Sequence, residues 1–363
     1  MNTELRVGLV GPLPPPSGGM ANQTLQLCEL LKSEGLSVEL VQTNLPYKPA
    51  WIASIPVLRA IFRLCAYIKQ LWQLTSNSDV IHVMANSGWS WHLFAAPAVW
   101  VAKVRRVPVI INYRGGKAEK FLLKSLRTVK PTLNASAKII VPSKFLHSVF
   151  SQFKIETSII ANITDITRFK TNPHEQHNLA QPHILVARNL EKIYDNRMAV
   201  QAFHEILNHF PNATLTIAGT GPEKDSLTNL VAELGITNKV TFTGRVDRKD
   251  MPDLYRSADV MLNPSQVDNM PNSILEALAS SVPVVSTNVG GIPYMVEHDK
   301  HVLLVNSEDY QAMAKEVCRV LSDDALRNRL INTGLQLVET CSWPAVREQW
   351  LNTYQELVNH AAA

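Results

Sequence analysis

The sequence has few of the features that mark membrane-spanning, disulfide-rich or metal-binding proteins. Its 363 residues include four cysteines and no Cys-x-x-Cys pair, so we expect reduced thiols rather than a disulfide framework. No uncharged apolar segment reaches the ~18 residues that a membrane-spanning helix needs. Met1–Arg6 is short and polar, which predicts no signal peptide. These absences favour a cytoplasmic protein.

Charge is also limited. The chain has 35 basic and 31 acidic residues, a net charge of +4, and is 46% hydrophobic. This mild basic excess is compatible with anionic substrates or an anionic membrane surface, and it is too weak to indicate a nucleic-acid partner. The length predicts two globular domains, each with its own core.

Short apolar segments alternate with helical patterns along the chain. Arg6–Val10 and Asp79–Met84 are typical of buried strands. The polar segment Thr171–Pro182 contains two prolines and is typical of a linker, after which the alternation restarts at His183. We therefore predict an α/β protein with two doubly wound, mostly parallel sheets. The expected domains are residues 1–170 and 183–342, with a linker at 171–182 and a final helix at 343–363.

The first predicted strand leads into a loop that ends in two glycines, Gly18 and Gly19, at the start of a helix. A strand, a glycine-rich loop and a helix N-terminus can cradle a phosphate or a sugar, but a plain strand-to-helix turn has the same pattern. The loop lacks a G-x-G-x-x-G fingerprint. This disfavours a dinucleotide-dependent oxidoreductase.

Polar side chains follow the next two predicted strands. Asn86 and His92 come after the strand that ends at Met84, and Arg114 comes after the strand PVIINY. Ligands of open α/β sheets bind at the carboxyl ends of strands, so these three residues are candidates for contacts with an acceptor. His82 lies within a strand, where a hydrogen-bonded core histidine is the favoured interpretation.

Trp51–Leu74 predicts a helix with a broad apolar face. Its only charged residues are Arg59, Arg63 and Lys69. Aromatic and basic residues on one helix are typical of contact with an anionic membrane surface. A helix packed on the sheet is the alternative.

Asn263–Pro293 is the most informative stretch. It predicts a loop, a helix, a short strand and a second turn at Gly290 and Gly291. Asp268 lies in the first loop and Glu276 in the helix, and the N–H groups of the helix start between them favour an anion. Two acids beside an anion site suit a nucleotide sugar. The alternative is a capped surface helix, with Asp268 as a solvated loop acid and Glu276 as a first-turn acid that complements the helix dipole.

Arg188 ends a predicted strand of the second half, where a guanidinium can pair with two diphosphate oxygens. A surface ion pair is the alternative. Gly219 and Gly221, in the sequence GTGP, permit close approach of the backbone to a ligand or to the opposite domain.

The segment DNMPNSILEALA resembles the E-x7-E motif of retaining glycosyltransferases of family four, the glycosyl transferases group 1, which have the GT-B fold. Asp268 replaces the first Glu of that motif and Asn269 replaces a Gly. The resemblance covers nearly the whole chain and is strongest from Arg188 to Val305. It implies two Rossmann-like domains that face each other across a cleft, a final helix that crosses back to the first domain, and transfer of a sugar from a nucleoside diphosphate with retention.

The resemblance also implies a donor site. Glu276 would accept hydrogen bonds from ribose hydroxyls, and Asp268 would hold the donor sugar. Arg188 would bind the diphosphate, with Lys192 as a weaker candidate for a second phosphate ligand. The remaining donor-side candidates are Gly18, Gly19, Gly219, Gly221, Arg245, Asn269, Met270, Pro271, Asn272 and Ser273. We predict Asp268, Arg188 and Arg114 as catalytic residues.

On the acceptor side the chain departs from the family. Met84 replaces the second His of a common H-x-H, and Arg114 stands where the next strand often has His. The acceptor-side catalytic contact is therefore open among Asn86, His92 and Arg114.

No D-x-D motif stands at a strand end, so we predict no metal and no cofactor besides the nucleotide-sugar substrate. The expected acceptor is a glycan or lipid-linked glycan of polysaccharide or glycolipid synthesis. The expected location is cytoplasmic, with peripheral contact to the inner face of the membrane. A catalytically silent sugar- or lipid-binding GT-B scaffold is the alternative, and donor turnover would separate the two.

Overall fold

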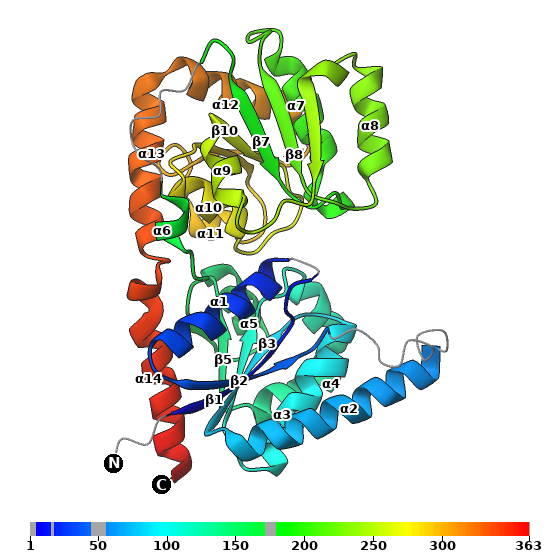
Figure 1. Cartoon of the computed structure of the whole chain (residues 1–363), viewed down its shortest axis with the longest axis vertical. Helices are drawn as coiled ribbons and strands as arrows, with labels where there is room; N and C mark the ends of the chain where they lie inside the picture. The colour runs from blue at the N-terminus through cyan, green and yellow to red at the C-terminus, as the bar shows by residue number, and fades with distance from the viewer. Residues whose placement is uncertain (1–4, 16–17, 45–55, 171–178, 363) are drawn as a thin grey trace. The chain divides into compact units, whose positions relative to one another are not determined.

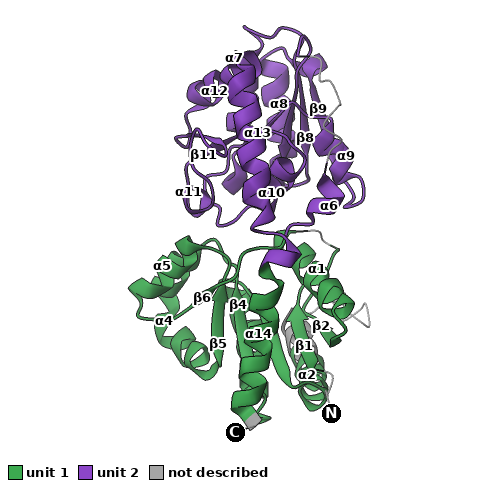
Figure 2. Cartoon of the chain, turned by 90° about the vertical axis from the view of Figure 1, so that its left-hand side faces the viewer, with its two compact units in different colours: residues 1–163, 346–363 green, residues 164–345 purple. Residues whose placement is uncertain are grey.

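The computed structural model describes residues 5–15, 18–44, 56–170 and 179–362, with side chains from residue 64 in the second helix. The chain divides into two compact units (Figures 1 and 2). Unit 1 contains residues 1–163 and 346–363, and unit 2 contains residues 164–345. Trp51–Ile55, the predicted start of a helix, and residues 171–178 of the predicted linker lie outside the described residues.

Unit 1 ends at Ile163, before the domain end expected at residue 170. The physical reason is a pair of hydrogen bonds to the first helix: Gln23 Nε2 donates to the Ile163 carbonyl at 2.7 Å, and the Ile163 N–H donates to Gln23 Oε1 at 3.0 Å. The next residue, Thr164, instead donates its N–H to the carbonyl of Cys341 in unit 2 at 2.9 Å.

Unit 1 is built on a six-stranded parallel sheet with the order β2-β1-β3-β4-β5-β6. Its two central strands, β3 and β4, are buried along their whole length. The order reverses between β1 and β3, and such switch points are where ligands of doubly wound sheets bind. The strands are β1 (Arg6–Gly11), β2 (Ser37–Gln42), β3 (Val80–Ala85), β4 (Val109–Tyr113), β5 (Lys138–Val141) and β6 (Ser158–Ile159).

Helices cover this sheet, and aromatic rings fill the space beneath them. Trp91 and Tyr113 are fully buried with ring centroids 6.2 Å apart, and Phe150 lies 5.0 Å from Tyr113. The helices are α1 (Gly19–Ser33), α2 (Pro56–Asn77), the π-helix η2 (Trp91–Ala95), α3 (Ala96–Val104), α4 (Ala118–Ala135), α5 (Lys144–Gln152) and α14 (Trp343–Ala362). None of the helices in the described ranges is long and apolar enough to cross a membrane.

Unit 2 has a second six-stranded parallel sheet with the order β12-β11-β10-β7-β8-β9. In chain order within the unit this is 3-2-1-4-5-6, the Rossmann arrangement, and it reverses between β7 and β10. The predicted α/β class with two parallel sheets is confirmed. The strands are β7 (His183–Ala187), β8 (Thr214–Ala218), β9 (Val240–Gly244), β10 (Val260–Asn263), β11 (Val284–Thr287) and β12 (Leu303–Val305).

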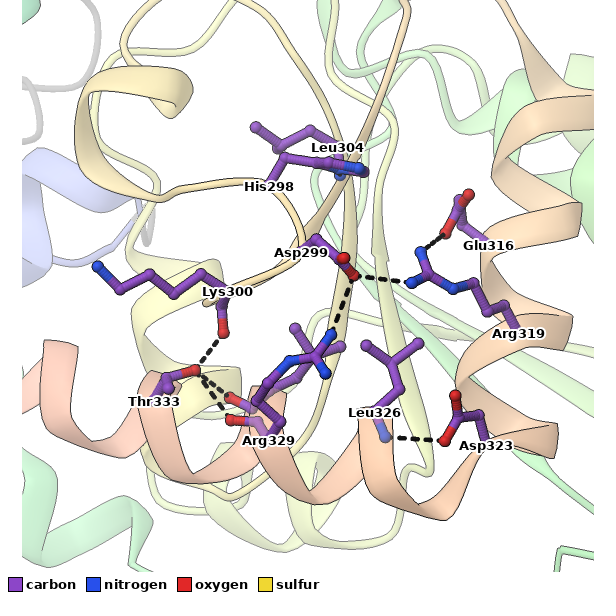
Figure 3. Close-up of polar contacts among 11 residues, drawn as sticks. His298, Asp299, Lys300, Leu304, Glu316, Arg319, Asp323, Leu326, Arg329 and Thr333 are labelled. Carbon is purple, nitrogen blue, oxygen red and sulfur yellow. Dashed lines mark hydrogen bonds and ion pairs between the residues drawn. The ribbon is translucent and has the colours of Figure 1, made fainter.

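Charged side chains tie two helices of unit 2 to the turn before β12 (Figure 3). Asp299 Oδ1 lies 2.9 Å from Arg319 on α12 and 3.3 Å from Arg329 on α13, while Asp323 accepts from the Leu326 N–H and caps α13. The Asp299 pairs are solvent-exposed and contribute little stability. The unit's helices are α6 (Ile166–Phe169), η3 (Lys192–Tyr194), α7 (Asn196–Ile206), α8 (Lys224–Glu233), η4 (Thr237–Lys239), α9 (Met251–Arg256), α10 (Asn272–Ala279), α11 (Ile292–Met295), α12 (Tyr310–Ser322) and α13 (Asp324–Glu339).

Helix α14 contributes core side chains to unit 1. Val346, Trp350 and Tyr354 are buried, and the Trp350 ring lies 4.9 Å from the ring of His82 on β3. The aromatic side chains of this helix therefore pack against the central strand β3. Unit 1 needs residues from both ends of the described chain to complete its core.

Replacement of Trp350 by Ala is expected to destabilise unit 1 by about 3–5 kcal/mol, because it leaves a large cavity beside His82. Hydrogen exchange of the full chain would measure the loss as faster exchange of β3 and β4 with little change in β7 and β10. Trp89→Ala is the matched control, because the Trp89 side chain is 78% exposed in the same unit. Equal exchange in both variants would show that α14 is not part of the unit 1 core.

Candidate functional site

The switch point of the unit 2 sheet carries a partly buried ion pair. Arg188 follows β7 and Asp268 follows β10; Arg188 Nη2 bonds to Asp268 Oδ2, and the two side chains are 11% and 15% exposed. Arg188 Nε donates to Asn263 Oδ1 at 2.7 Å, and the guanidinium lies 5.0 Å from the ring centroid of Tyr194. Within the described chain, Arg188 Nη1 has no hydrogen-bond partner. Two nitrogens of the guanidinium, Nε and Nη2, are thus hydrogen-bonded within unit 2, and the edge at Nη1 is open to a ligand.

A network of buried polar side chains around Asn263 fixes the position of Arg188. Asn263 is fully buried; its Oδ1 also accepts from Ser265 Oγ at 3.0 Å, and its Nδ2 donates to Ser286 Oγ at 2.9 Å. Thr287 Oγ1 donates to the Ser265 carbonyl at 2.6 Å. Sequence reasoning missed these residues. The available signal was the unusual run of polar residues at the ends of the buried strands VMLN and VVST.

The loop that carries Asp268 is fixed by the second turn of the stretch. The Gly291 N–H donates to the Asp268 carbonyl at 2.9 Å. A Cβ on Gly290, which has φ of 55°, would lie 2.1 Å from the Asp268 carbonyl oxygen, and one on Gly291 would lie 1.9 Å from that of Asn269. Only glycine permits this approach. The predicted tight turn is therefore a support for the acidic loop.

Helix α10 begins directly after this loop, and no side chain caps it. Asn269 and Met270 are buried, and Pro271 enters the helix in an extended conformation. The Ser273 hydroxyl is buried and has no hydrogen-bond partner among the described residues. An uncapped helix start with an unsatisfied hydroxyl provides donors for an anion.

Glu276, one turn further along α10, is held by a tyrosine. Its Oε2 accepts from the hydroxyl of Tyr255, which lies fully buried on α9, at 3.0 Å. Burial raises the pKa of Glu276 to about 7, although the Tyr255 hydrogen bond and the charges of Arg168, Arg248 and Arg188 act to lower it. Glu276 is partly buried and titrates near neutrality, so the alternative of a solvated first-turn acid does not describe it.

Some of the other residues predicted to bind the donor do not lie beside the Arg188–Asp268 pair. A Cβ on Gly219 would lie 2.1 Å from the Arg188 carbonyl oxygen, and one on Gly221 would lie 2.3 Å from that of Leu190. Both glycines therefore admit the loop that follows β7 within unit 2. Lys192 is exposed in η3 and lines a separate hollow of about 310 Å³. Arg245 is exposed after β9.

On the unit 1 sheet, Gly18 and Gly19 form the start of α1. Gly18 is the N-cap, no side chain caps the helix, and no described atom lies within 4 Å of the position of a Gly18 Cβ. The helix start is therefore open, as a phosphate cradle requires.

His82 is a core residue, as predicted. It is fully buried, its Nδ1 lies 2.7 Å from the Tyr354 hydroxyl, and its Nε2 lies 3.0 Å from Asn112 Nδ2. Burial, with a smaller effect of Arg114, lowers its pKa to about 3. The imidazole is neutral at physiological pH and both of its nitrogens are used.

The acceptor-side candidates differ in their surroundings. Arg114 bonds to Asn112 Oδ1 at 3.2 Å and to two further amide oxygens. Asn86 Oδ1 accepts from the Ser87 N–H and lies 2.6 Å from the position of a Cβ on Gly115, the residue after Arg114. His92 is exposed on η2, with its ring 6.1 Å from Phe121. Asn86 and Arg114 are thus neighbours, and no described contact brings His92 to them.

The part of the chain that matches a known protein family lies within unit 2. Residues 168–336 match the model of the family described as "Glycosyl transferases group 1". An uncharacterised glycosyltransferase of Methanocaldococcus jannaschii is 35% identical over 157 residues, which are 43% of this chain and 40% of that protein. A D-inositol 3-phosphate glycosyltransferase of Corynebacterium urealyticum is 30% identical over 176 residues, 47% of this chain and 40% of that protein. The matches thus span about two fifths of these relatives.

Solved structures match the whole chain at low identity. A structure of Anabaena HepE in complex with UDP and glucose aligns with 97% of this chain and 100% of its own, with a TM-score of 0.73 and 18% identity. Sucrose-phosphate synthase from Thermosynechococcus elongatus aligns with 99% and 100%, with a TM-score of 0.73 and 18% identity. These likenesses establish the fold. Residues 168–336 are thus similar to the glycosyl transferases group 1 family, and the fold of the chain is GT-B.

Proposed function

We propose that the chain is a glycosyltransferase that moves a sugar from a nucleoside-diphosphate sugar to an acceptor with retention of anomeric configuration. The observation that carries this proposal is the Arg188–Asp268 pair at the switch point, beside the uncapped start of α10. The family match and the names of the relatives support it. The UDP and glucose bound to the Anabaena protein support a nucleotide-sugar donor.

In this proposal the leaving diphosphate is bound by positive groups that are already in place. The open edge of Arg188 and the N-terminus of α10 with the Ser273 hydroxyl would stabilise the charge that develops as the glycosidic bond breaks. Because these groups are fixed before reaction, little reorganisation is needed at the transition state. The proposed reaction uses no metal, and Lys192 would supply a weaker second phosphate contact.

The two acids have different proposed roles. Asp268 neutralises Arg188 and, with Asn269, Met270 and Pro271, would hold the donor sugar. Glu276 would accept from the ribose hydroxyls, for which its carboxylate form is required. Arg245 would lie beside the base, and Asn86, His92 and Arg114 would form the acceptor side. A silent scaffold is the second candidate, because Met84 replaces the second His of the H-x-H pattern and Lys192 is exposed in η3. A scaffold would bind the donor without turnover.

We further propose that the acceptor is a lipid-linked glycan of polysaccharide or glycolipid synthesis, met at an anionic membrane surface on the cytoplasmic side. Helices α2 and α3 support this. They contain no acidic residue and expose Trp72 and Trp100, each beneath a cation: Arg105 lies 4.9 Å from the Trp72 ring and Lys103 lies 5.3 Å from that of Trp100. A mostly apolar groove of about 670 Å³ runs beside Trp72. Exposed tryptophans with basic partners are typical of interfacial binding.

Arg188→Gln is expected to weaken binding of a nucleoside diphosphate at least about tenfold, or 1.4 kcal/mol, because it removes the cation of the diphosphate site. Asp268→Asn is expected to leave that binding unchanged or tighter, because it removes a negative charge, while transfer from the nucleotide sugar slows. Calorimetry with UDP, GDP and ADP, followed by a turnover assay with the sugar of the preferred base, would measure both. Arg319→Gln, at an exposed arginine of the same unit, is the control; unchanged binding in Arg188→Gln would contradict the site.

The affinity for a nucleoside diphosphate is expected to increase as the pH rises through about 7. Glu276 has a pKa near 7, so at pH 6 it is mostly protonated and a poorer acceptor for the ribose hydroxyls, whereas at pH 8 it is charged. Calorimetry at both pH values would test this. In Glu276→Gln, the part of this increase in affinity that comes from Glu276 should be lost. The part that comes from titration of the ligand's own phosphate should remain. Equal pH dependence in the two proteins would exclude Glu276 from the site.

The chain is expected to sediment with vesicles that contain anionic phospholipid and not with neutral vesicles, and added salt should weaken the interaction. Trp72→Ala and Arg105→Gln should each reduce the bound fraction several-fold, because they remove an interfacial anchor and a cation. Lys300→Gln, at an exposed lysine of unit 2, should have no effect. Absence of sedimentation, together with full turnover on a water-soluble acceptor, would contradict the membrane proposal.

A further inference from the structure

We propose that Arg114 binds an anionic group of the acceptor, a phosphate or a carboxylate, at the carboxyl end of β4. This inference rests on the proposed function, and it narrows the acceptor to a class of charged molecules. It assigns Arg114 to substrate binding and not to proton transfer, since a guanidinium that stays protonated cannot act as a base.

The side chain of Arg114 is fixed by three neutral oxygens. Its Nε donates to Asn112 Oδ1 at 3.2 Å, and its Nη1 donates to Gln23 Oε1 at 3.4 Å and to Asn162 Oδ1. These partners come from β4, α1 and the segment where the chain leaves unit 1. Two of the three nitrogens are thus used, and Nη2 has no hydrogen-bond partner in the part of the chain that the structure describes. Nη2 presents two N–H donors in a fixed direction.

The charge of Arg114 is not neutralised. No carboxylate of the described residues forms an ion pair with it, whereas Arg188 of unit 2 is paired with Asp268. Burial lowers the pKa of Arg114 to about 10, so the group is still charged at neutral pH. A partly buried charge is costly unless it is paired. Amide oxygens solvate the guanidinium without cancelling its charge, and an oxyanion at Nη2 would cancel it.

The neighbours of Arg114 keep this charge in place. Asn112 turns its Oδ1 toward Arg114 because its Nδ2 bonds to His82 Nε2, and His82 Nδ1 in turn bonds to the Tyr354 hydroxyl on α14. With Nε2 accepting, the proton of the neutral imidazole lies on Nδ1 and is donated to Tyr354. Every member of this chain is neutral except Arg114. A structural arginine would need no such arrangement, since one carboxylate would hold it.

The surroundings favour an anion as well. Gln23, which bonds to Arg114, lies in the second turn of α1, and the N-terminus of that helix has no side-chain cap. The helix dipole adds positive potential there. The anionic group is assigned to the acceptor because, in the proposed function, the donor diphosphate binds at Arg188 and the N-terminus of α10.

Hydrogen exchange of the full chain with inorganic phosphate, against chloride at matched ionic strength, would test the site. Phosphate is expected to slow exchange around residues 112–116 in wild type and in Arg188→Gln, and not in Arg114→Gln. Protection that persists in Arg114→Gln, or is absent from wild type, would overturn the inference. Loss of protection at α10 in Arg188→Gln reports separately on the donor site, so failure of one site is distinguishable from failure of the other.

Asn162→Asp is the second variant. It is isosteric, keeps Arg114, and gives the guanidinium an internal carboxylate. The affinity of this region for phosphate should fall about tenfold or more, since a charged hydrogen bond contributes about 1.5–3 kcal/mol. Because the variant gains an ion pair, it should fold at least as well as wild type, which answers the objection that Arg114→Gln merely destabilises unit 1. Unchanged phosphate protection in a folded Asn162→Asp protein would overturn the inference.

Calorimetry with UDP, GDP and ADP distinguishes the two sources of the anion. Arg114→Gln should bind the preferred nucleotide as wild type does, whereas Arg188→Gln should bind it about tenfold more weakly. If Arg114→Gln weakens nucleotide binding as much as Arg188→Gln does, the anion at Arg114 is the donor diphosphate, and the assignment to the acceptor is wrong.

Discussion

The ion pair between Arg188 and Asp268 is positioned by several separate parts of unit 2: the strand order, a buried polar network and a glycine turn. The two residues are far apart in the sequence and meet because β7 and β10 are adjacent at the point where the strand order reverses. Buried amide and hydroxyl groups around Asn263 position the arginine, and the glycine turn at 290–291 supports the aspartate loop. A pair that is mostly buried gains from these extra hydrogen bonds, because they offset the cost of removing two charges from water.

Unit 1 also positions an arginine at a strand end, Arg114, but no carboxylate of the described residues pairs with it. Its strand-end arginine is held by neutral amides and by a histidine–tyrosine contact that reaches helix α14. The two sheets share one topology class yet present different electrostatics at their carboxyl edges: a neutral pair in unit 2 and an unpaired cation in unit 1. Both sheets are parallel and doubly wound, with different strand orders, and the side chains at their strand ends make the electrostatic difference.

Much of the fold could be predicted from the sequence, because buried parallel strands are continuous β-branched runs and their helices have regular apolar spacing. The place of Arg188 at a strand end and of Asp268 in the loop before a helix followed from the same pattern. Their mutual pairing did not, since it depends on strand order. Gly219 and Gly221 were predicted to let the backbone approach a ligand or the opposite domain. In the structure they admit the loop at Arg188 and Leu190, which sequence spacing does not reveal. The raised pKa of Glu276 could not be predicted either, because it is caused by burial in the folded unit, against the opposing effect of the Tyr255 hydrogen bond.

The discontinuity of unit 1 has a consequence for biosynthesis. Residues 164–345 form unit 2 as one continuous segment, whereas unit 1 requires residues 346–362 to cover His82 and complete its core. During translation, unit 2 therefore has all of its strands before unit 1 has its last core helix. Synthesis from the N-terminus usually lets the first domain fold first. In this chain the core of unit 1 is therefore completed only after every strand of unit 2 has been synthesised.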